Sequence, residues 1–165
     1  MKSFTLIVLA FAVFCGVQSI AAQNKTIVLV RHAEKVDATS QDPELSEAGK
    51  QRAERLVKVG GKYRPGAFYS TNFKRTRDTL APLAAKRRKT VEIYDARKPA
   101  DLLDTIMKSK IKRHIVSGHS NTVPGLANLI TSKDIFKNLD ETEYGVMWVI
   151  RIKDGKVVKV EVFPF

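Results

Sequence analysis

Short apolar runs alternate along this chain with longer amphipathic segments, and this order limits the folds that are open to it. The apolar runs are typical of buried strands, and they cover residues 26–30, 67–70, 91–94 and 114–117. Segments with apolar residues at helical spacing follow them, from Ser46 to Gly60 and over residues 73–86, 100–108 and 122–130. Repeated strand–helix units predict a mainly parallel sheet with helices on both faces.

The end of the chain has a different pattern. Residues 145–163 alternate as strand, turn and strand, with Asp154-Gly155 at the turn, which is a strong hairpin signal. We therefore expect an α/β fold: a three-layer sandwich with a mainly parallel central sheet, helices on both faces and a C-terminal antiparallel hairpin. No internal repeat or linker divides residues 23–165, so we expect a single domain there.

The first residues, MKSFTLIVLAFAVFCGVQSIAAQ, have the layout of a secretory signal peptide over residues 1–22. A basic start at Lys2 precedes an apolar stretch over residues 4–17 and then small residues up to Ala22. We expect an exported protein, periplasmic or secreted, without stable membrane insertion after cleavage; an uncleaved anchor is the alternative. Cys15 is the only cysteine, so the mature chain would form no disulfide.

The chain is strongly basic, with a formal net charge of +12, or +11 without Lys2. Such a surplus favours anionic partners, and a small phosphorylated substrate fits it. The only dense basic run covers residues 86–89, between a predicted helix and a strand, and no aromatic residues for base stacking interrupt it. We interpret this run as a solvated loop and expect no nucleic-acid partner.

Polar residues gather at the predicted carboxyl ends of three strands. Arg31 and His32 follow the first strand, Thr71 and Arg75 follow the second, and His119 follows the fourth after a glycine. Ligands of open α/β sheets bind at this edge, so we expect these residues to share one crevice. The two arginines present planar forks of donors that suit a phosphoryl group, and the Thr71 hydroxyl is a further expected phosphate ligand.

The histidines suggest the chemistry. A neutral imidazole at His32 can attack phosphorus, and flanking guanidinium groups favour its neutral form. His119 is expected to donate a hydrogen bond to the phosphoryl oxygens. His114 lies at the opposite end of its strand, and we interpret it as structural. There is no HxH, HExxH or acidic cluster at metal-ligand spacing, so we expect no metal and no cofactor.

Four motifs, in order, resemble those of the histidine phosphatase superfamily, which has the phosphoglycerate-mutase-like fold. They are RHAE at 31–34, LSEAG at 45–49 with QRA at 51–53, YSTNFKRTRDT at 69–79, and SGHSN at 117–121. The resemblance implies that His32 becomes phosphorylated and that water then releases phosphate, with Arg31, Arg75 and His119 forming the phosphate pocket. Only about forty residues separate the arginine motif from the second histidine, as in short members such as bacterial phosphohistidine phosphatases, and we do not expect mutase activity.

The resemblance leaves the proton donor to the leaving group open. Another branch of the superfamily has an aspartate after the second histidine, where this chain has Ser120. Glu34 and Asp95 are the candidate acids, with Glu143 behind them, and a protonated phosphohistidine leaving group would need none. We prefer Arg75 to Arg77 as the phosphate ligand, because Arg75 lies four residues before Thr79, as the family pattern has it.

The leading interpretation is an exported, metal-independent phosphatase that hydrolyses phosphomonoesters or related phosphoryl compounds through a phosphohistidine on His32. The alternative is a secreted phosphate- or polyanion-binding protein of the same fold without turnover. The loop after His32 is short and polar and does not identify a substrate, so we expect broad activity.

Overall fold

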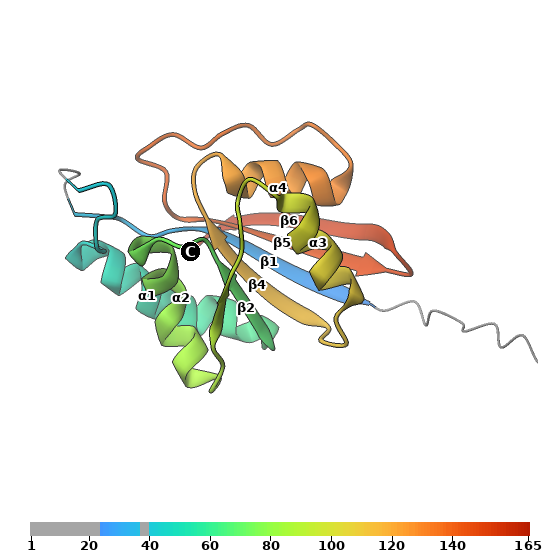
Figure 1. The fold of residues 1–165 in the computed structure, drawn as a ribbon, viewed down its shortest axis with the longest axis horizontal. Helices are drawn as coiled ribbons and strands as arrows, with labels where there is room; N and C mark the ends of the chain where they lie inside the picture. Colours follow the sequence, from blue (N-terminus) through green and yellow to red (C-terminus); the bar gives the residue numbers. More distant parts are fainter. Residues whose placement is uncertain (1–23, 37–39) are drawn as a thin grey trace, which may run out of the picture.

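A six-stranded mixed sheet forms the centre of the protein in the computed structural model, which describes residues 24–36 and 40–165 (Figure 1). The predicted signal peptide lies outside the described residues. The strand order is β3-β2-β4-β1-β5-β6. The strands are β1 (Lys25–Arg31), β2 (Ala67–Ser70), β3 (Val91–Ile93), β4 (Arg113–Gly118), β5 (Val146–Lys153) and β6 (Lys156–Pro164). β1 to β4 are parallel, and β5 and β6 form the antiparallel hairpin that Asp154-Gly155 predicts.

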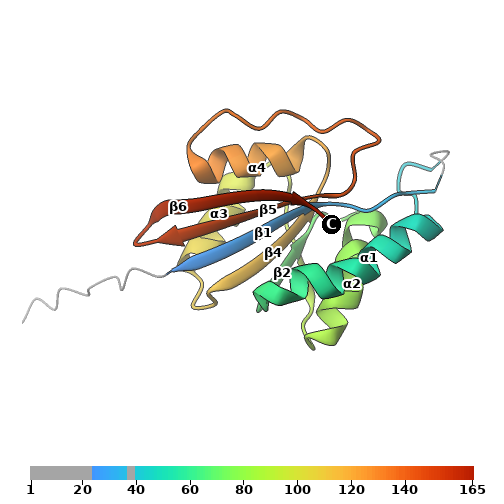
Figure 2. The same ribbon diagram turned by 180° about the vertical axis from the view of Figure 1, so that it is seen from behind.

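Helices cover both faces of this sheet. They are α1 (Glu47–Val59), α2 (Lys74–Lys86), α3 (Pro99–Lys108) and α4 (Thr122–Thr131), with a 3-10 turn η1 (Gly60–Tyr63) after α1. Figures 1 and 2 show α1 and α2 on one face of the sheet and α3 and α4 on the other. The predicted three-layer α/β fold is confirmed. The 3-10 turn was not predicted, because Gly60 continues in a right-handed helical conformation instead of ending the helix.

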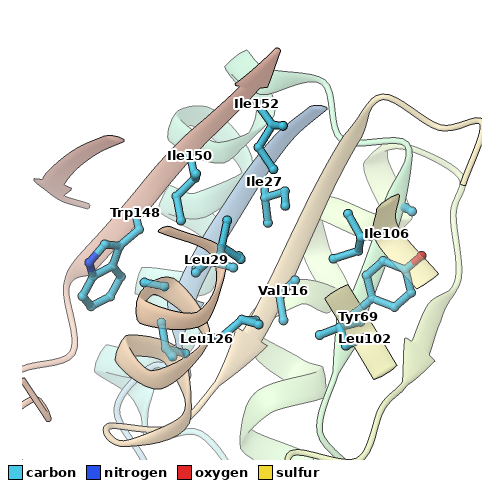
Figure 3. Close-up of a cluster of buried hydrophobic side chains, with 14 residues drawn as sticks. Ile27, Leu29, Tyr69, Leu102, Ile106, Val116, Leu126, Trp148, Ile150 and Ile152 are labelled. Carbon is cyan, nitrogen blue, oxygen red and sulfur yellow. The ribbon is translucent and has the colours of Figure 1, made fainter. Parts of the chain in front are cut away.

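Each face of the sheet has its own hydrophobic core. Figure 3 shows the one under α3 and α4, which contains Ile106, Val116, Leu126 and Trp148. A second cluster fills the space under α1 and α2. The apolar residues of β1 alternate between the two clusters, with Ile27 and Leu29 in the first and Val28 and Val30 in the second. This explains why the β1 sequence is apolar throughout: both faces of a central parallel strand are buried.

The first turn of α1 is fixed against the segment that follows β1. The Ser46 hydroxyl caps the helix by accepting a hydrogen bond from the Gly49 N–H at 3.1 Å. Ala48 is exposed, whereas Gly49 is buried. A Cβ atom at position 49 would overlap the Glu34 carbonyl oxygen, so only glycine lets the helix come this close.

The parallel register brings three loops to one edge of the sheet. Arg31 pairs with Gly118 at the ends of β1 and β4, and Ser70 pairs with Ser117 at the end of β2. The residues after these three strands are therefore neighbours, as the sequence predicts. In the described part of the chain, no helix combines the length and the hydrophobicity that a membrane crossing requires.

Candidate active site

A cleft of about 350 Å³ lies at the carboxyl ends of the parallel strands. It brings together four residues that the sequence singles out, Arg31, His32, Arg75 and His119. Its other lining residues are Lys35, Phe73, Ser120, Asn121, Thr122 and Glu141. A larger cavity of about 750 Å³, lined mainly by residues of α1 and α2, contains none of these arginines and histidines, so we place the chemistry in the smaller cleft.

His32 is held in one orientation and one tautomer. Its backbone N–H donates to the Gly118 carbonyl at 2.9 Å, and its ring Nδ1 lies 2.8 Å from the Ala33 carbonyl oxygen. A carbonyl only accepts, so the neutral ring carries its proton on Nδ1 and its lone pair on Nε2. Burial lowers the pKa of His32 to about 4, and the positive charge of Arg31 adds to this effect. At neutral pH Nε2 is therefore unprotonated.

His119 faces His32, with the two ring centroids 5.5 Å apart. Its Nε2 lies 3.0 Å from the Thr71 hydroxyl, and an Arg75 guanidinium nitrogen makes a long contact of 3.5 Å with its Nδ1. Because arginine only donates, Nδ1 accepts and Nε2 donates to Thr71 in this arrangement. Burial lowers the pKa of His119 to about 4 as well, with Arg75 as the next cause.

Thr71 lies behind His119 and does not line the cleft. It is buried, and its hydroxyl oxygen bonds both to His119 and to the Thr76 hydroxyl at 2.9 Å. The sequence suggested Thr71 as a direct phosphate ligand, whereas the structure gives it the geometry of a residue that orients His119. The N-terminus of α2 is also engaged, because the Lys74 N–H donates to Asp42 at 2.8 Å.

Arg31 is 1 % exposed, and the loop before β5 engages its outer nitrogens. Nη1 donates to the carbonyl oxygens of Asp140 at 2.6 Å and Glu143 at 3.0 Å, and Nη2 to the Glu141 carboxylate at 3.1 Å. The guanidinium carbon lies 4.3 Å from the centroid of the Tyr144 ring. Arg31 Nε is buried and has no partner in the described residues, so this N–H is a donor left without an acceptor.

Arg75 approaches the cleft from α2. Its guanidinium carbon lies 4.4 Å from the centroid of the Phe73 ring, and Asp42 is an ion-pair partner at 3.8 Å. Its Nε, like that of Arg31, is buried without a partner in the described residues. Arg77 is directed elsewhere and donates to the exposed Asn72 side chain at 2.5 Å. The geometry therefore agrees with the choice of Arg75 over Arg77.

The structure does not bring the two candidate acids into the cleft. Glu34 accepts two hydrogen bonds from Arg52 Nε, at 2.9 and 3.0 Å, and this contact lowers the pKa of its carboxyl. Asp95 lines a different pocket, beside Tyr94, and its hydrogen bonds with Arg97 lower its pKa. Both carboxyls are thus held ionised and away from His32.

The carboxylate that does line the cleft is Glu141, which the sequence reasoning missed. One of its oxygens binds Arg31 and the other accepts from the Ser120 hydroxyl at 3.1 Å. The Ser120 hydrogen bond is the main reason that the pKa of Glu141 is lowered. Its sequence context, LDETEYG at 139–145, is an acidic cluster in a basic chain, and that contrast was the available signal.

His114, interpreted from sequence as structural, is fully buried at the start of β4. Its Nε2 lies 2.8 Å from the Ile111 carbonyl, and its ring stacks on Tyr69. Within residues 24–36 and 40–165, no three His, Cys, Asp or Glu side chains are grouped as metal ligands would be.

Comparison with known protein families gives a match to the first half of the described domain. Residues 27–98 match the sequence model of the histidine phosphatase superfamily (branch 1), a segment that includes Arg31, His32 and Arg75. The resemblance of the chain to this superfamily, drawn from its four motifs, is confirmed. No curated protein matches the chain.

Solved structures with the same fold include several phosphatases. A mycobacterial glucosyl-3-phosphoglycerate phosphatase has a TM-score of 0.66 at 13% identity, over 87% of this chain and 99% of that one. A candidate phosphohistidine phosphatase, SixA from Agrobacterium tumefaciens, has a TM-score of 0.65 at 17% identity, over 83% of this chain and 97% of that one. The protein histidine phosphatase SixA, solved with tungstate, has a TM-score of 0.68 at 14% identity, over 84% of this chain and 96% of that one. At these identities the likeness shows the fold.

Proposed function

We propose that this chain is an exported, metal-independent phosphatase that hydrolyses phosphomonoesters or related phosphoryl compounds through a phosphohistidine on His32. The observation that carries the proposal is the fixed tautomer of His32 in a cleft that two arginines line. Arg31 and Arg75 each keep a buried Nε without a partner in the described residues, and these two donors suit an oxyanion. Export rests on the layout of residues 1–22 alone.

The reaction has two displacements at phosphorus. In the first, the lone pair of His32 Nε2 forms a bond to phosphorus, the bond to the leaving oxygen breaks, and that oxygen departs with the electron pair and takes up a proton. In the second, water attacks phosphorus, the P–N bond breaks, its electron pair returns to Nε2, and one proton of the water is released to solvent. The histidine is regenerated, and the net reaction consumes one water.

His119 can serve a bound phosphoryl group by changing tautomer. Its Nδ1 faces Arg75 through a contact of only 3.5 Å, so an incoming anion can displace that contact and accept from a protonated Nδ1. The Thr71 hydroxyl behind the ring both donates and accepts, so it can partner Nε2 in either tautomer. An anion in the cleft also raises the pKa of His119.

The class of substrate follows from the position of Glu34 and Asp95, the two candidate proton donors, outside the cleft. Glu34 and Asp95 are engaged with arginines outside the cleft, so the leaving oxygen or nitrogen receives no proton from them. Substrates with leaving groups that depart easily, such as aryl phosphates and protonated phosphohistidine, are therefore favoured. A mycobacterial phosphatase of this fold has been solved with inorganic phosphate, which supports an anion site of this kind in the fold.

The test is hydrolysis of an aryl phosphate by the purified protein, with and without a chelator, together with His32→Asn. We expect chelator-resistant turnover that is lost in the variant, and an acid-labile phosphoryl group on His32 after rapid quenching. Arg75→Gln should lower kcat/KM by about 100-fold or more, because it removes a charged donor to the phosphoryl oxygens. Arg77→Gln removes the same charge two residues away and should change kcat/KM by less than about twofold.

Two outcomes would count against the proposal. Phosphate binding without turnover and without a phosphoryl group on His32 would favour the phosphate-binding protein of the same fold. Loss of turnover in Arg77→Gln but not in Arg75→Gln would show that the assignment of the phosphate ligand is wrong.

A further inference from the structure

Nine exposed lysines and arginines occupy the end of the sheet opposite the cleft. They lie in three segments of the chain, each of which leads into a parallel strand. Lys62 and Arg64 precede β2, the run Lys86–Lys89 precedes β3, and Lys110, Lys112 and Arg113 lie at the start of β4. We call these nine residues the basic face. The run 86–89 by itself is typical of a solvated loop, but the fold places the other two basic segments beside it.

Hydrogen bonds join the three segments into one surface. Arg87 Nε donates to the Pro65 carbonyl at 3.4 Å, and the Gly66 N–H donates to the Arg113 carbonyl at 2.8 Å. The strand register agrees, because Ala67 pairs with His114 and Phe68 with Val91. β2, β3 and β4 are adjacent and parallel, so their amino ends form a continuous edge (Figure 1).

The charge of the basic face is not neutralised locally. Residues 60–66, 85–90 and 109–113 contain no aspartate or glutamate. Among the described residues, the ion pairs involve other lysines and arginines and none of these nine. Lys86 lies in the last turn of α2, where the helix dipole favours a cation, but Lys110 and Lys112 lie outside any helix. Stabilisation of helix ends therefore does not explain the whole face.

Two features favour a lipid surface as the partner. Ile111 lies between Lys110 and Lys112 and is 39% exposed, so an apolar side chain stands among the cations, as in peripheral membrane contacts. Tyr63 is the only aromatic residue of these segments, and it packs against the core and offers no stacking platform for bases.

The direction of the chain agrees with this partner. β1 begins at Lys25 at the same end of the sheet, where the Thr26 N–H donates to the Lys112 carbonyl at 2.8 Å. The described part of the chain therefore starts at the end that carries the basic face. A membrane on this side also leaves the cleft, at the opposite end of the strands, open to solvent.

We propose that the basic face binds anionic phospholipid headgroups and holds the protein at a membrane surface with its cleft directed away from the lipid. Each cation near an anionic membrane contributes to binding, and the contribution falls as salt is added. This proposal stands independently of the catalytic role of His32.

The experiment is co-sedimentation of the full chain with vesicles of phosphatidylcholine alone and of phosphatidylcholine with phosphatidylglycerol. The test variant combines Lys62→Gln, Lys89→Gln and Lys110→Gln, one change in each segment. The control variant combines Lys50→Gln, Lys98→Gln and Lys137→Gln, which removes three exposed charges outside the basic face. Thermal unfolding of all three proteins checks that they remain folded.

We expect the wild type and the control to bind the anionic vesicles alike, and the test variant to bind on the order of 100-fold more weakly at low salt. Equal weakening in both variants would overturn the proposal, because net charge alone would then explain binding. Equal binding to both kinds of vesicle by all three proteins would also overturn it, in favour of the N-terminal segment. Tighter binding to a single-stranded oligonucleotide than to the anionic vesicles would assign the face to nucleic acid instead.

Discussion

The arginine and histidine at the end of β1 differ in what holds them. His32 is fixed by two backbone carbonyls, that of Gly118 on the neighbouring strand and that of the next residue, Ala33. Arg31 is fixed by a loop more than a hundred residues away, through Asp140, Glu141 and Glu143. The histidine is thus oriented by the backbone of the sheet, whereas the charge of the arginine is shared with a distant carboxylate.

Glu141 competes with phosphate for Arg31, and this leads to a prediction. Its carboxylate is bonded to a guanidinium nitrogen that an anion in the cleft would otherwise use. We expect Glu141→Gln to lower the inhibition constant of inorganic phosphate by about 3- to 10-fold, because a like charge leaves the cleft. Steady-state inhibition at fixed substrate measures this change.

Glu143→Gln is the matched control for this effect. Glu143 bonds to Arg31 only through its backbone carbonyl, so its variant loses the same charge without losing a contact. An equal effect of both variants would mean that long-range charge, and not the contact with Arg31, determines phosphate affinity.

At the scale of the elements, α1 supports the catalytic loop from behind. Its first turn packs on the backbone of Glu34, and Arg52 in its second turn binds the Glu34 carboxylate and the carbonyl of Phe165. One helix therefore connects the segment after His32 to the end of the chain. The Glu34 carboxylate, a candidate acid by sequence, is used in this connection.

Two helical glycines give opposite predictions. Gly49→Ala places a methyl group on the Glu34 carbonyl, and we expect it to lower the free energy of unfolding by roughly 2–3 kcal/mol. Gly125 in α4 has open space around the same position, so Gly125→Ala should raise that free energy by about 0.5–1 kcal/mol. Denaturant unfolding of the two variants checks both signs, and a Gly49→Ala variant as stable as the wild type would contradict this account of the close approach.

On the scale of the whole molecule, the parallel strands separate two kinds of surface. The cleft with its two histidines lies at their carboxyl ends, and the basic face lies at their amino ends. His32 and His114 are buried and His119 is half-buried, and loss of solvent lowers the pKa of all three to about 4.

These pKa values predict that acid destabilises the fold. Between pH 6.5 and 4 the unfolded chain binds protons at its histidines and the folded protein does not, so the free energy of unfolding falls as the pH falls through this window. Each histidine contributes up to about 3 kcal/mol, which is fully present above pH 6.5 and lost towards pH 4. Denaturant unfolding at a series of pH values measures the slope.

His114→Asn tests whether a histidine outside the cleft contributes to this dependence of the free energy of unfolding on pH. The variant does not titrate, so its stability should depend less on pH between 6.5 and 4.5 than that of the wild type. This window lies above the ordinary pKa of carboxyl groups, so changes in Glu and Asp contribute little to it. An unchanged slope would show that His114 is not the origin.

The amino-acid sequence determined the fold class, the hairpin and the positions of His32 and His119 at strand ends. Apolar runs such as residues 26–30 must be buried, and parallel pairing then brings the strand ends together whatever their distance along the chain. Only the tertiary structure decided which side chains lie around the histidines and which are engaged in other contacts. Glu141 and Tyr144 come from a loop without periodicity, Arg52 draws Glu34 away, and Thr71 turns behind His119. These contacts join residues far apart in sequence, so they depend on the packing of whole elements and leave no local pattern.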